Sequence, residues 1–564
     1  MSRLSTIDPC QIPPDIANTC ATIAACCESV YEWLMRCGEN SQRLGDFETA
    51  IRCYQECANY ASHHGSFGRL GDSRIELALQ AIGQTIPVPR RKQLHGDTRY
   101  LHIFTEGYDT GGHTALCMQW ILSQKEGCTH NLLFTNRLAK QPEKLTSAVK
   151  LSGGRIFQLS ENLDLVERAR QLREIAFEES DIVVLHIHAW DPLPSIAFSV
   201  SSGPRIIFLN HAYHVFWVGS LIADVVFDLN PIASYYSKRY RGVENSQIVP
   251  IPLDSKAINT VEFTQLRNKT RAFFAIPESS VVFLTVGAKC KYNSTSKNRF
   301  DLAAYRILTE LENSYIVAVG LPNSGVWKTL SDAFPGRFLP VGVTPDLDAF
   351  HAIADIYLET FPFTSLTALL ESCVYGIPCV RAPRDIPKLY RSDGPEFDFL
   401  FDPPDLDEYV SYALKLAKDT TLRHRIGSDL SLAIQSQHYL QNWLKYLKSA
   451  LAAAPLEHSL HRTEPKKIPI QDRDHWIQIR RLAEGWSPMP LFVPRNVFVD
   501  RLLVNDLTNV LGLSPVAFRE YLSCHMSFFL RAAIRRMVSK FRFSSFFGVV
   551  KLLIKIRFKS RSLG

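Results

Sequence analysis

Two series of short apolar segments occupy the middle of the 564-residue chain. Each segment is rich in β-branched or aromatic residues, and longer helix-like segments separate one from the next. Continuous apolar strands of this kind are typical of a mainly parallel sheet that helices cover on both faces. We therefore predict two doubly wound α/β domains, at residues 96–255 and 256–455, with a ligand-binding cleft at the carboxyl ends of their strands. The predicted strands are YLHIFTE, HNLLFTN, RIFQLS, DIVVLHIH, PRIIFLN and DVVFDLN in the first domain, and SVVFLTVG, SYIVAVG, RFLPVG, DIYLET and PCVRAP in the second.

Residues 1–95 have a helical rather than a strand-like pattern. In LGDFETAIRCYQECANYA, apolar residues recur at spacings of three and four, at Phe47, Ala50, Tyr54 and Ala58. The pattern resembles one tetratricopeptide-like hairpin. Because stacks of such repeats need about three copies to be stable and no convincing second copy is present, the favoured interpretation is a helical extension that packs on the next domain.

The C-terminal part, residues 456–564, is predicted to be a linker followed by a basic tail. Residues 521–564 contain ten Lys or Arg and no Asp or Glu, and these cations alternate with aromatic and aliphatic residues. This composition is typical of a basic amphipathic helix on an anionic membrane surface. The alternative is a helix that packs on its own protein with its basic face in solvent. The tail lacks a nucleic-acid recognition motif, so nucleic acid is not an expected partner.

Composition and cysteine usage indicate the compartment. The formal net charge is +7, and the thirteen cysteines show no repeated metal-ligand spacing, which suits reduced thiols. The N-terminus lacks a basic region followed by an apolar core, and no uncharged apolar stretch approaches the ~20 residues that span a bilayer. We therefore expect a cytoplasmic protein, with peripheral attachment to the inner face of the cell membrane if the tail binds lipid.

The segment ETFPFTSLTALLES, residues 359–372, carries the first candidate chemistry. A strand ends there, and Thr364, Ser365 and Thr367 lead into a helix. Free amides and the positive dipole end of a helix N-terminus attract phosphate, and hydroxyls add donors. Glu371 lies about one turn further, where its carboxylate can accept hydrogen bonds from ribose hydroxyls. The alternative is ordinary helix capping with a solvated glutamate.

Glycines and lysines follow the first strand of each predicted domain. Gly111 and Gly112 lie between the first strand and a helix, where they allow a ligand to approach the backbone closely, with His113 beside them. After the first strand of the second domain, Lys291 is the leading candidate to neutralise a leaving diphosphate. Lys289 and Lys297 are further candidates, and the alternative for all three is a set of solvated loop cations.

Four more histidines lie at strand ends of the first domain, at His186, His188, His211 and His214. The first pair could share a face of a strand as metal ligands do, but no third ligand is evident, so no metal site is expected. We expect His186, His188 and His211 to line the acceptor side of the cleft. A neutral imidazole can take the proton of an acceptor hydroxyl. The candidates for this general base are His214 and, nearly equally, His113.

Residues 98–450 resemble glycosyltransferases of the GT-B fold, which has two Rossmann-like domains. The similarity is sharpest at residues 355–383, DIYLETFPFTSLTALLESCVYGIPCVRAP. In the retaining family 4, two glutamates flank seven residues, whereas here Glu371 stands at the second position and Phe363 at the first. The pattern is closer to the inverting family 41, which includes the O-linked N-acetylglucosamine transferase and bacterial protein glycosyltransferases.

The resemblance implies a role for each candidate residue. Lys291 would stabilise the diphosphate, the hydroxyls of Thr364, Ser365 and Thr367 would bind it, and Glu371 would hold the ribose. The donor would lie mainly on the second domain and the acceptor mainly on the first.

The sequence thus predicts a hexosyl- or N-acetylhexosaminyltransferase that moves a sugar, with inversion, from a UDP-sugar to a protein or to an envelope glycan or lipid. No cofactor besides this co-substrate is expected, since a helix dipole and a lysine can replace a divalent cation. Two alternatives stay open. One is a retaining family-4-like enzyme of surface polysaccharide synthesis. The other is a noncatalytic membrane-associated protein built on a degenerate transferase core.

Overall fold

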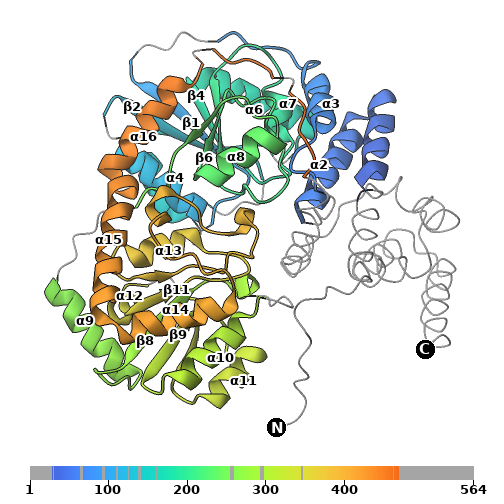
Figure 1. The fold of residues 1–564 in the computed structure, drawn as a ribbon. Coiled ribbons are helices and arrows are strands. Elements are labelled where there is room, and N and C mark those ends of the chain that lie inside the picture. Colours follow the sequence, from blue (N-terminus) through green and yellow to red (C-terminus); the bar gives the residue numbers. More distant parts are fainter. Residues whose placement is uncertain are drawn as a thin grey trace, which may run out of the picture.

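In the computed structural model, two sheets lie one above the other with helices on their faces (Figure 1). Gly111, Lys297 and the basic tail at 521–564 lie outside the residues that the structure describes. The described residues are 28, 31–63, 68–91, 96–108, 112–124, 126–136, 141–160, 162–253, 260–292, 298–344, 347–455, 457–461 and 463–468.

The first sheet has seven parallel strands in the order β3-β2-β1-β4-β5-β6-β7. The order reverses beside β1, and at such a switch point the carboxyl ends of adjacent strands leave a crevice for a ligand. The strands are β1 (Thr98–Phe104), β2 (Cys128–Phe134), β3 (Ile156–Gln158), β4 (Ile182–His186), β5 (Arg205–Asn210), β6 (Val225–Asp228) and β7 (Ser246–Ile248). The helices between them are α4 (Gly112–Ser123), α5 (Glu143–Leu151), α6 (Leu165–Glu179), α7 (Leu193–Ala197) and α8 (Pro231–Tyr240).

The second sheet has five parallel strands in the order β10-β9-β8-β11-β12, which repeats the same topology. The predicted α/β class with two doubly wound domains is therefore confirmed. The strands are β8 (Val281–Val286), β9 (Ser314–Val319), β10 (Phe338–Gly342), β11 (Ile356–Leu358) and β12 (Cys379–Val380). The helices are α9 (Thr260–Phe273), α10 (Phe300–Glu310), α11 (Val326–Ala333), α12 (Asp348–Ile353), α13 (Leu366–Cys373), α14 (Leu406–Lys418), α15 (Thr420–His438) and α16 (Leu440–Ala453).

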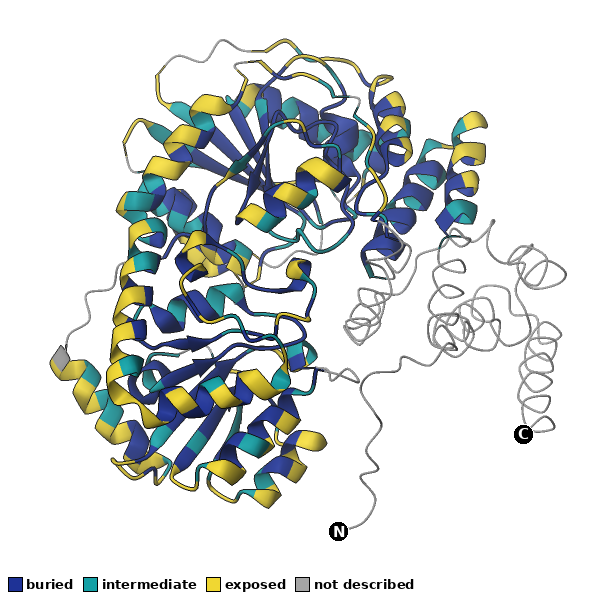
Figure 2. Ribbon diagram, in the orientation of Figure 1, coloured by how far each residue is buried: buried dark blue, intermediate teal, exposed yellow. Residues whose placement is uncertain are grey.

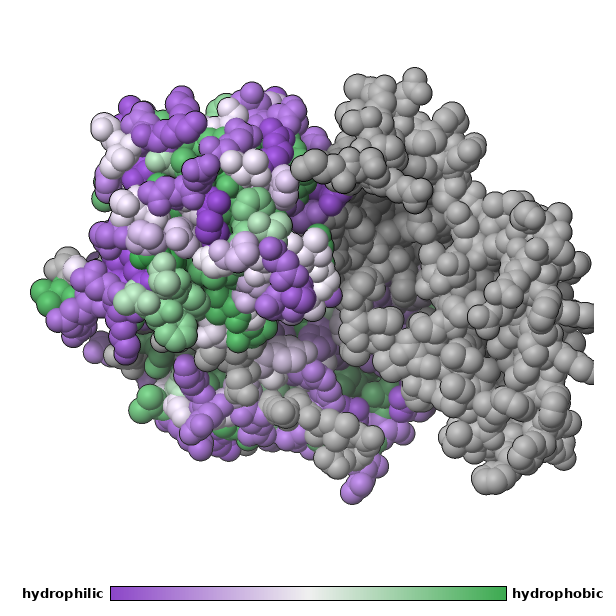
Figure 3. Space-filling model, turned by 90° about the horizontal axis from the view of Figure 1, so that it is seen from below, coloured by the Kyte–Doolittle hydropathy of each residue, from purple (hydrophilic) through white to green (hydrophobic). Residues whose placement is uncertain are grey.

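The central strands of both sheets are buried, the edge strands β3, β7 and β10 are partly exposed, and the outer faces of the helices carry many exposed residues (Figure 2). Seen from below, hydrophilic side chains cover much of the coloured surface, with smaller apolar areas between them (Figure 3). Within the described residues, none of the helices combines the length and the apolar character needed to cross a membrane.

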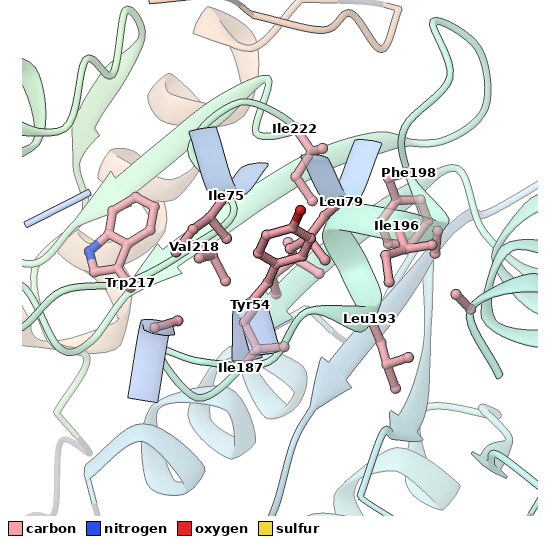
Figure 4. Close-up of a cluster of buried hydrophobic side chains, with 14 of the residues drawn as sticks. Tyr54, Ile75, Leu79, Ile187, Leu193, Ile196, Phe198, Trp217, Val218 and Ile222 are labelled. Carbon is pink, nitrogen blue, oxygen red and sulfur yellow. The ribbon is translucent and has the colours of Figure 1, made fainter. Parts of the chain in front are cut away.

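The helical extension, α2 (Phe47–His63) and α3 (Ser73–Gly83), packs on the first domain. Tyr54, Ile75 and Leu79 contribute to the same apolar cluster as Ile196 and Phe198 of the domain (Figure 4). Buried polar contacts fix the position of α3. The Glu76 carboxylate accepts hydrogen bonds from the Ser220 hydroxyl at 2.7 Å and from the Leu221 amide at 2.8 Å.

The last helix, α16, crosses back from the second domain to the first, alongside which it runs in Figure 1. The indole of Trp443 donates to the Pro250 carbonyl at 2.6 Å and its ring packs edge-on against Trp120 of α4. Residues 457–461 continue over the first domain, where the amide of His461 donates to the Leu221 carbonyl at 3.0 Å. The sequence assigns α16 to the domain at 256–455, but its apolar face completes the core of the first domain.

Candidate functional site

The turn between β11 and α13 is held by hydrogen bonds within the second domain. Thr360 donates its hydroxyl to the Phe363 carbonyl at 2.6 Å. Thr364 uses both its amide and its hydroxyl to bond the Tyr390 carbonyl, each at 3.0 Å. Ser365 is the N-cap residue of α13, and its side chain makes no capping hydrogen bond. The Thr364 hydroxyl therefore serves the turn itself, while the buried Ser365 hydroxyl lies 3.5 Å from the hydroxyl of Thr360.

Lys291 lies directly against this turn. It belongs to the short helix Lys289–Tyr292 that follows β8, and its ammonium donates to the Thr364 carbonyl at 2.7 Å. Burial lowers the pKa of Lys291, and the nearby Cys290 and Glu359 partly oppose that shift. An ammonium that has lost part of its hydration gains more from an anionic ligand than one in bulk water. Lys289, by contrast, is exposed.

Gly287, at the carboxyl end of β8, brings these groups together. A Cβ at this position would lie 3.0 Å from Thr360 Cγ2, 3.1 Å from Ser365 Oγ and 3.3 Å from Lys291 Cδ. The absence of a side chain at Gly287 thus leaves room among the turn, the N-cap and the lysine. Sequence reasoning missed Gly287, although a glycine that ends the first strand of a doubly wound domain is a usable signal for close ligand approach.

The first domain reaches the same place through α4. A Cβ at Gly112, the first residue of α4, would lie 3.2 Å from Thr367 Oγ1 in the first turn of α13. The N-terminal ends of two helices from different domains therefore meet. The free amides and the positive dipole end of a helix N-terminus favour an anion. A place where two such ends meet therefore suits a phosphate group.

Glu371 lies further along α13 and is half-buried. Burial raises the pKa of Tyr375 to about 12, and the charges of Asp348 and then Glu371 add to that shift. Glu371 therefore lies near Tyr375, which follows the end of α13 and whose hydroxyl donates to Asp348. Phe363, which stands where family 4 has its first glutamate, is buried and packs edge-on against Tyr390 at 4.9 Å between ring centroids.

The candidate histidines separate into distinct environments. His214 lies where the two domains meet, with its ring 6.3 Å from the ring of Tyr390. His113 and His211 stack on each other at 5.0 Å. Burial lowers the pKa of His113 to about 4 and that of His211 to about 3. Both imidazoles are therefore neutral near pH 7, and His113 is a weak base.

His188 and His186 point to different partners. The hydroxyl of Tyr108 and Nε2 of His188 are 3.3 Å apart, and burial lowers the pKa of His188. His186 is fully buried in β4, where its Nε2 lies 2.9 Å from Nδ1 of His102. The prediction that His186 lines the acceptor cleft is wrong, because its ring faces the neighbouring strand inside the domain.

Comparison with models of known protein families and with curated proteins finds no match. Among solved structures, the fold is similar to that of an O-GlcNAc transferase mutant of Thermobaculum terrenum, with 13% identity, a TM-score of 0.45 and coverage of 77% of this chain and 82% of that one. It is also similar to HepE of Anabaena in complex with UDP-glucose, with 11% identity, a TM-score of 0.47 and coverage of 64% and 100%.

Sucrose-phosphate synthase of Thermosynechococcus elongatus is a third similar structure, with 13% identity, a TM-score of 0.44 and coverage of 63% and 100%. At these values, the assignment of the fold depends on the strand orders of the two sheets, each of which reverses beside its first strand as in Rossmann-like domains.

Proposed function

We propose that the protein is a glycosyltransferase that binds the diphosphate of a nucleotide sugar between α13, α4 and Lys291. The observation that carries this proposal is the convergence of Lys291, Ser365 and Thr360 on the side-chain-free position of Gly287, with Gly112 of the other domain against Thr367. Helix amides, a hydroxyl and a partly desolvated cation are the groups that hold a diphosphate.

The same groups would assist departure of the nucleotide. When the anomeric carbon is displaced, its bond to the phosphate oxygen breaks and negative charge grows on the diphosphate. The Lys291 ammonium has three N–H donors, one of which is used in the hydrogen bond to the Thr364 carbonyl. The remaining protons can stabilise the leaving charge, an effect that is largest for preorganised donors in a site with little water.

The acceptor would approach from the first domain. Its hydroxyl oxygen attacks the anomeric carbon, and the proton passes to a base, for which His214 is the proposed group because it lies at the domain boundary beside Tyr390. His113, with its pKa lowered to about 4, is a poorer match to neutral pH. Direct displacement gives inversion, and the buried Phe363 offers no carboxylate at the place of the first family-4 glutamate.

The finer assignments follow from the resemblance described for the sequence. They are a UDP-sugar as donor, a hexose or N-acetylhexosamine as the transferred group, Glu371 as the ribose ligand, and a protein or an envelope glycan or lipid as acceptor. No cofactor is assigned to the reaction. The basic tail is proposed to place a cytoplasmic enzyme on an anionic membrane. Removal of residues 521–564 should then release the protein from anionic vesicles without changing donor binding.

Donor binding tests the proposal most directly. The melting temperature is measured with UDP-glucose, UDP-N-acetylglucosamine and GDP-mannose, because a ligand that binds only the folded state raises it. We expect one UDP-sugar to stabilise the wild type, and Lys291→Ala to abolish the shift. Lys289→Ala, an exposed lysine of the same short helix, is the matched control and should keep it. Absence of both a shift and sugar release with every nucleotide sugar would favour the noncatalytic alternative.

A further inference from the structure

Three histidines form a buried chain across the first sheet, on the adjacent strands β2, β1 and β4. Nδ1 of His130 lies 3.0 Å from Nε2 of His102, and Nδ1 of His102 lies 2.9 Å from Nε2 of His186. All three side chains are fully buried. Within the described residues, the outer nitrogens of this chain, Nε2 of His130 and Nδ1 of His186, have no hydrogen-bond partner.

A cysteine closes one side of the chain. Cys117 of α4 is a fully buried free thiol, and its sulfur together with one nitrogen each of His102 and His186 forms a group whose atoms all lie within 4.8 Å of one another. The group combines three separate elements, β1, β4 and α4. This group contains no carboxylate. It shares no residue with the proposed diphosphate site.

We propose that His102, His186 and Cys117 supply three ligands of a tetrahedral zinc ion, whose fourth position is taken by a non-protein ligand such as water. One thiolate and two imidazoles are ligands that Zn²⁺ prefers, and carboxylate-binding ions such as Mg²⁺ or Ca²⁺ have no suitable oxygen there. Two nitrogens bound to a tetrahedral zinc at about 2.0 Å lie about 3.3 Å apart. The observed 2.9 Å between the two ring nitrogens requires only a small separation of the rings.

The third histidine supplies the outer contact that metal-bound imidazoles usually have. When His102 donates its Nε2 proton to Nδ1 of His130, its Nδ1 lone pair is left toward His186. Zinc binding then moves the ring proton of His186 from Nε2 to Nδ1 and releases the thiol proton of Cys117, so that both neutral imidazoles keep one proton each. Burial raises the pKa of the Cys117 thiol, and zinc coordination is what would hold its thiolate there.

The proposed ion would act on the architecture rather than on the chemistry. Cys117 lies in the second turn of α4, whose first residue, Gly112, meets Thr367 of the second domain. A zinc ion that links Cys117 to His102 of β1 and His186 of β4 would fix the depth and rotation of α4 on the sheet. The first domain would thereby present the α4 N-terminus at a constant position in the cleft.

Elemental analysis of the full-length protein, purified without chelators, tests this inference. We expect about one zinc per chain in the wild type and none in Cys117→Ser. Cys53→Ser, which changes a buried cysteine of α2 outside the group, is the matched control and should keep the zinc. Circular dichroism identifies a variant that has not folded.

Cobalt substitution of the wild type makes the test independent of any variant. The cobalt protein should show an intense thiolate-to-cobalt charge-transfer band, which a site without sulfur lacks. Wild-type protein that holds no zinc after purification and after incubation with zinc would overturn the inference. Full zinc content in folded Cys117→Ser, or a cobalt spectrum without the thiolate band, would overturn it equally. None of these readouts requires transferase activity, so the result is independent of the proposed reaction.

Discussion

On the second domain, the candidate donor groups come from two strand ends, with Lys291 after β8 and the turn at 364–367 after β11. On the first domain, the histidines come from several separate segments and pack against one another or against aromatic rings. On the donor side, backbone groups of the turn bind the Lys291 ammonium next to the N-terminus of α13. The histidine side is a packed layer of imidazole and other aromatic rings. The first arrangement suits a fixed anionic group, and the second suits proton transfer and shape selection.

Replacement of Lys291 should have the largest effect on the donor side. For Lys291→Ala we expect turnover to fall about 10²–10³-fold, since removal of one preorganised donor to a developing charge has this effect. Lys289→Ala should change turnover by less than about twofold, because the exposed lysine loses only a screened charge. Steady-state kinetics with the stabilising UDP-sugar provide the measurement. Equal losses in the two variants would contradict the role of Lys291.

The histidine side is tested by comparison of two imidazoles. His214→Ala should lower turnover about 10²-fold with little change in the KM of the donor, as expected for loss of a general base. His113→Ala should have a smaller effect on turnover, because the pKa of His113 is lowered to about 4 and its ring contributes mainly packing. A larger kinetic loss in His113→Ala would reverse the assignment of the base.

The buried imidazoles also predict how stability depends on pH. The pKa of His113 falls from 6.5 to about 4 on folding, so the unfolded chain binds a proton more readily than the folded chain. The stabilisation is therefore complete above pH 6.5 and is lost as the pH falls from there toward 4. Urea denaturation should give a smaller decrease in the free energy of unfolding between pH 6.5 and 5 for His113→Gln than for the wild type, by about 1.6 kcal/mol. An unchanged pH dependence would contradict this.

Two threonines of the same turn should give smaller effects, each on a different property. The Thr364 hydroxyl bonds the Tyr390 carbonyl, so Thr364→Val should lower the free energy of unfolding by about 1 kcal/mol. Thr367 faces Gly112 across the domains, so Thr367→Val should weaken donor binding by about fivefold at nearly unchanged stability. Thermal melts and donor titrations separate the two effects. If both variants lose donor affinity alone, Thr364 contributes to the site as well as to the turn.

The sequence was informative where structure depends on local order. Short apolar runs separated by helix-like segments predicted both sheets, and the hydroxyl-rich turn at 364–367 predicted a helix start close to the N-cap found at Ser365, because strand ends and helix starts are short-range features. The contact of Lys291 with Thr364, 73 residues apart, followed from the doubly wound topology, which places strand ends side by side. Local order also explains why Gly112 was found from its place after the first strand.

Contacts that depend on tertiary packing could not be predicted in this way. Spacing along one strand paired His186 with His188, whereas the fold pairs His186 with His102 on the next strand. Cys117 gave no signal, because its sulfur meets these rings only when α4 packs on the sheet. Tyr390 was missed for the same reason, since its ring and carbonyl reach the site from a segment beyond β12.

The return of α16 to the first domain has a consequence for biosynthesis. Trp443 covers Trp120 and bonds Pro250, although nearly two hundred residues of the second domain separate it from that proline. A ribosome that has completed the seven-stranded sheet has therefore not yet made the helix that seals it. The core of the first domain is therefore completed only after the second domain has been translated. Until then the apolar surface around Trp120 is exposed on the nascent chain, and such a surface is a binding site for chaperones.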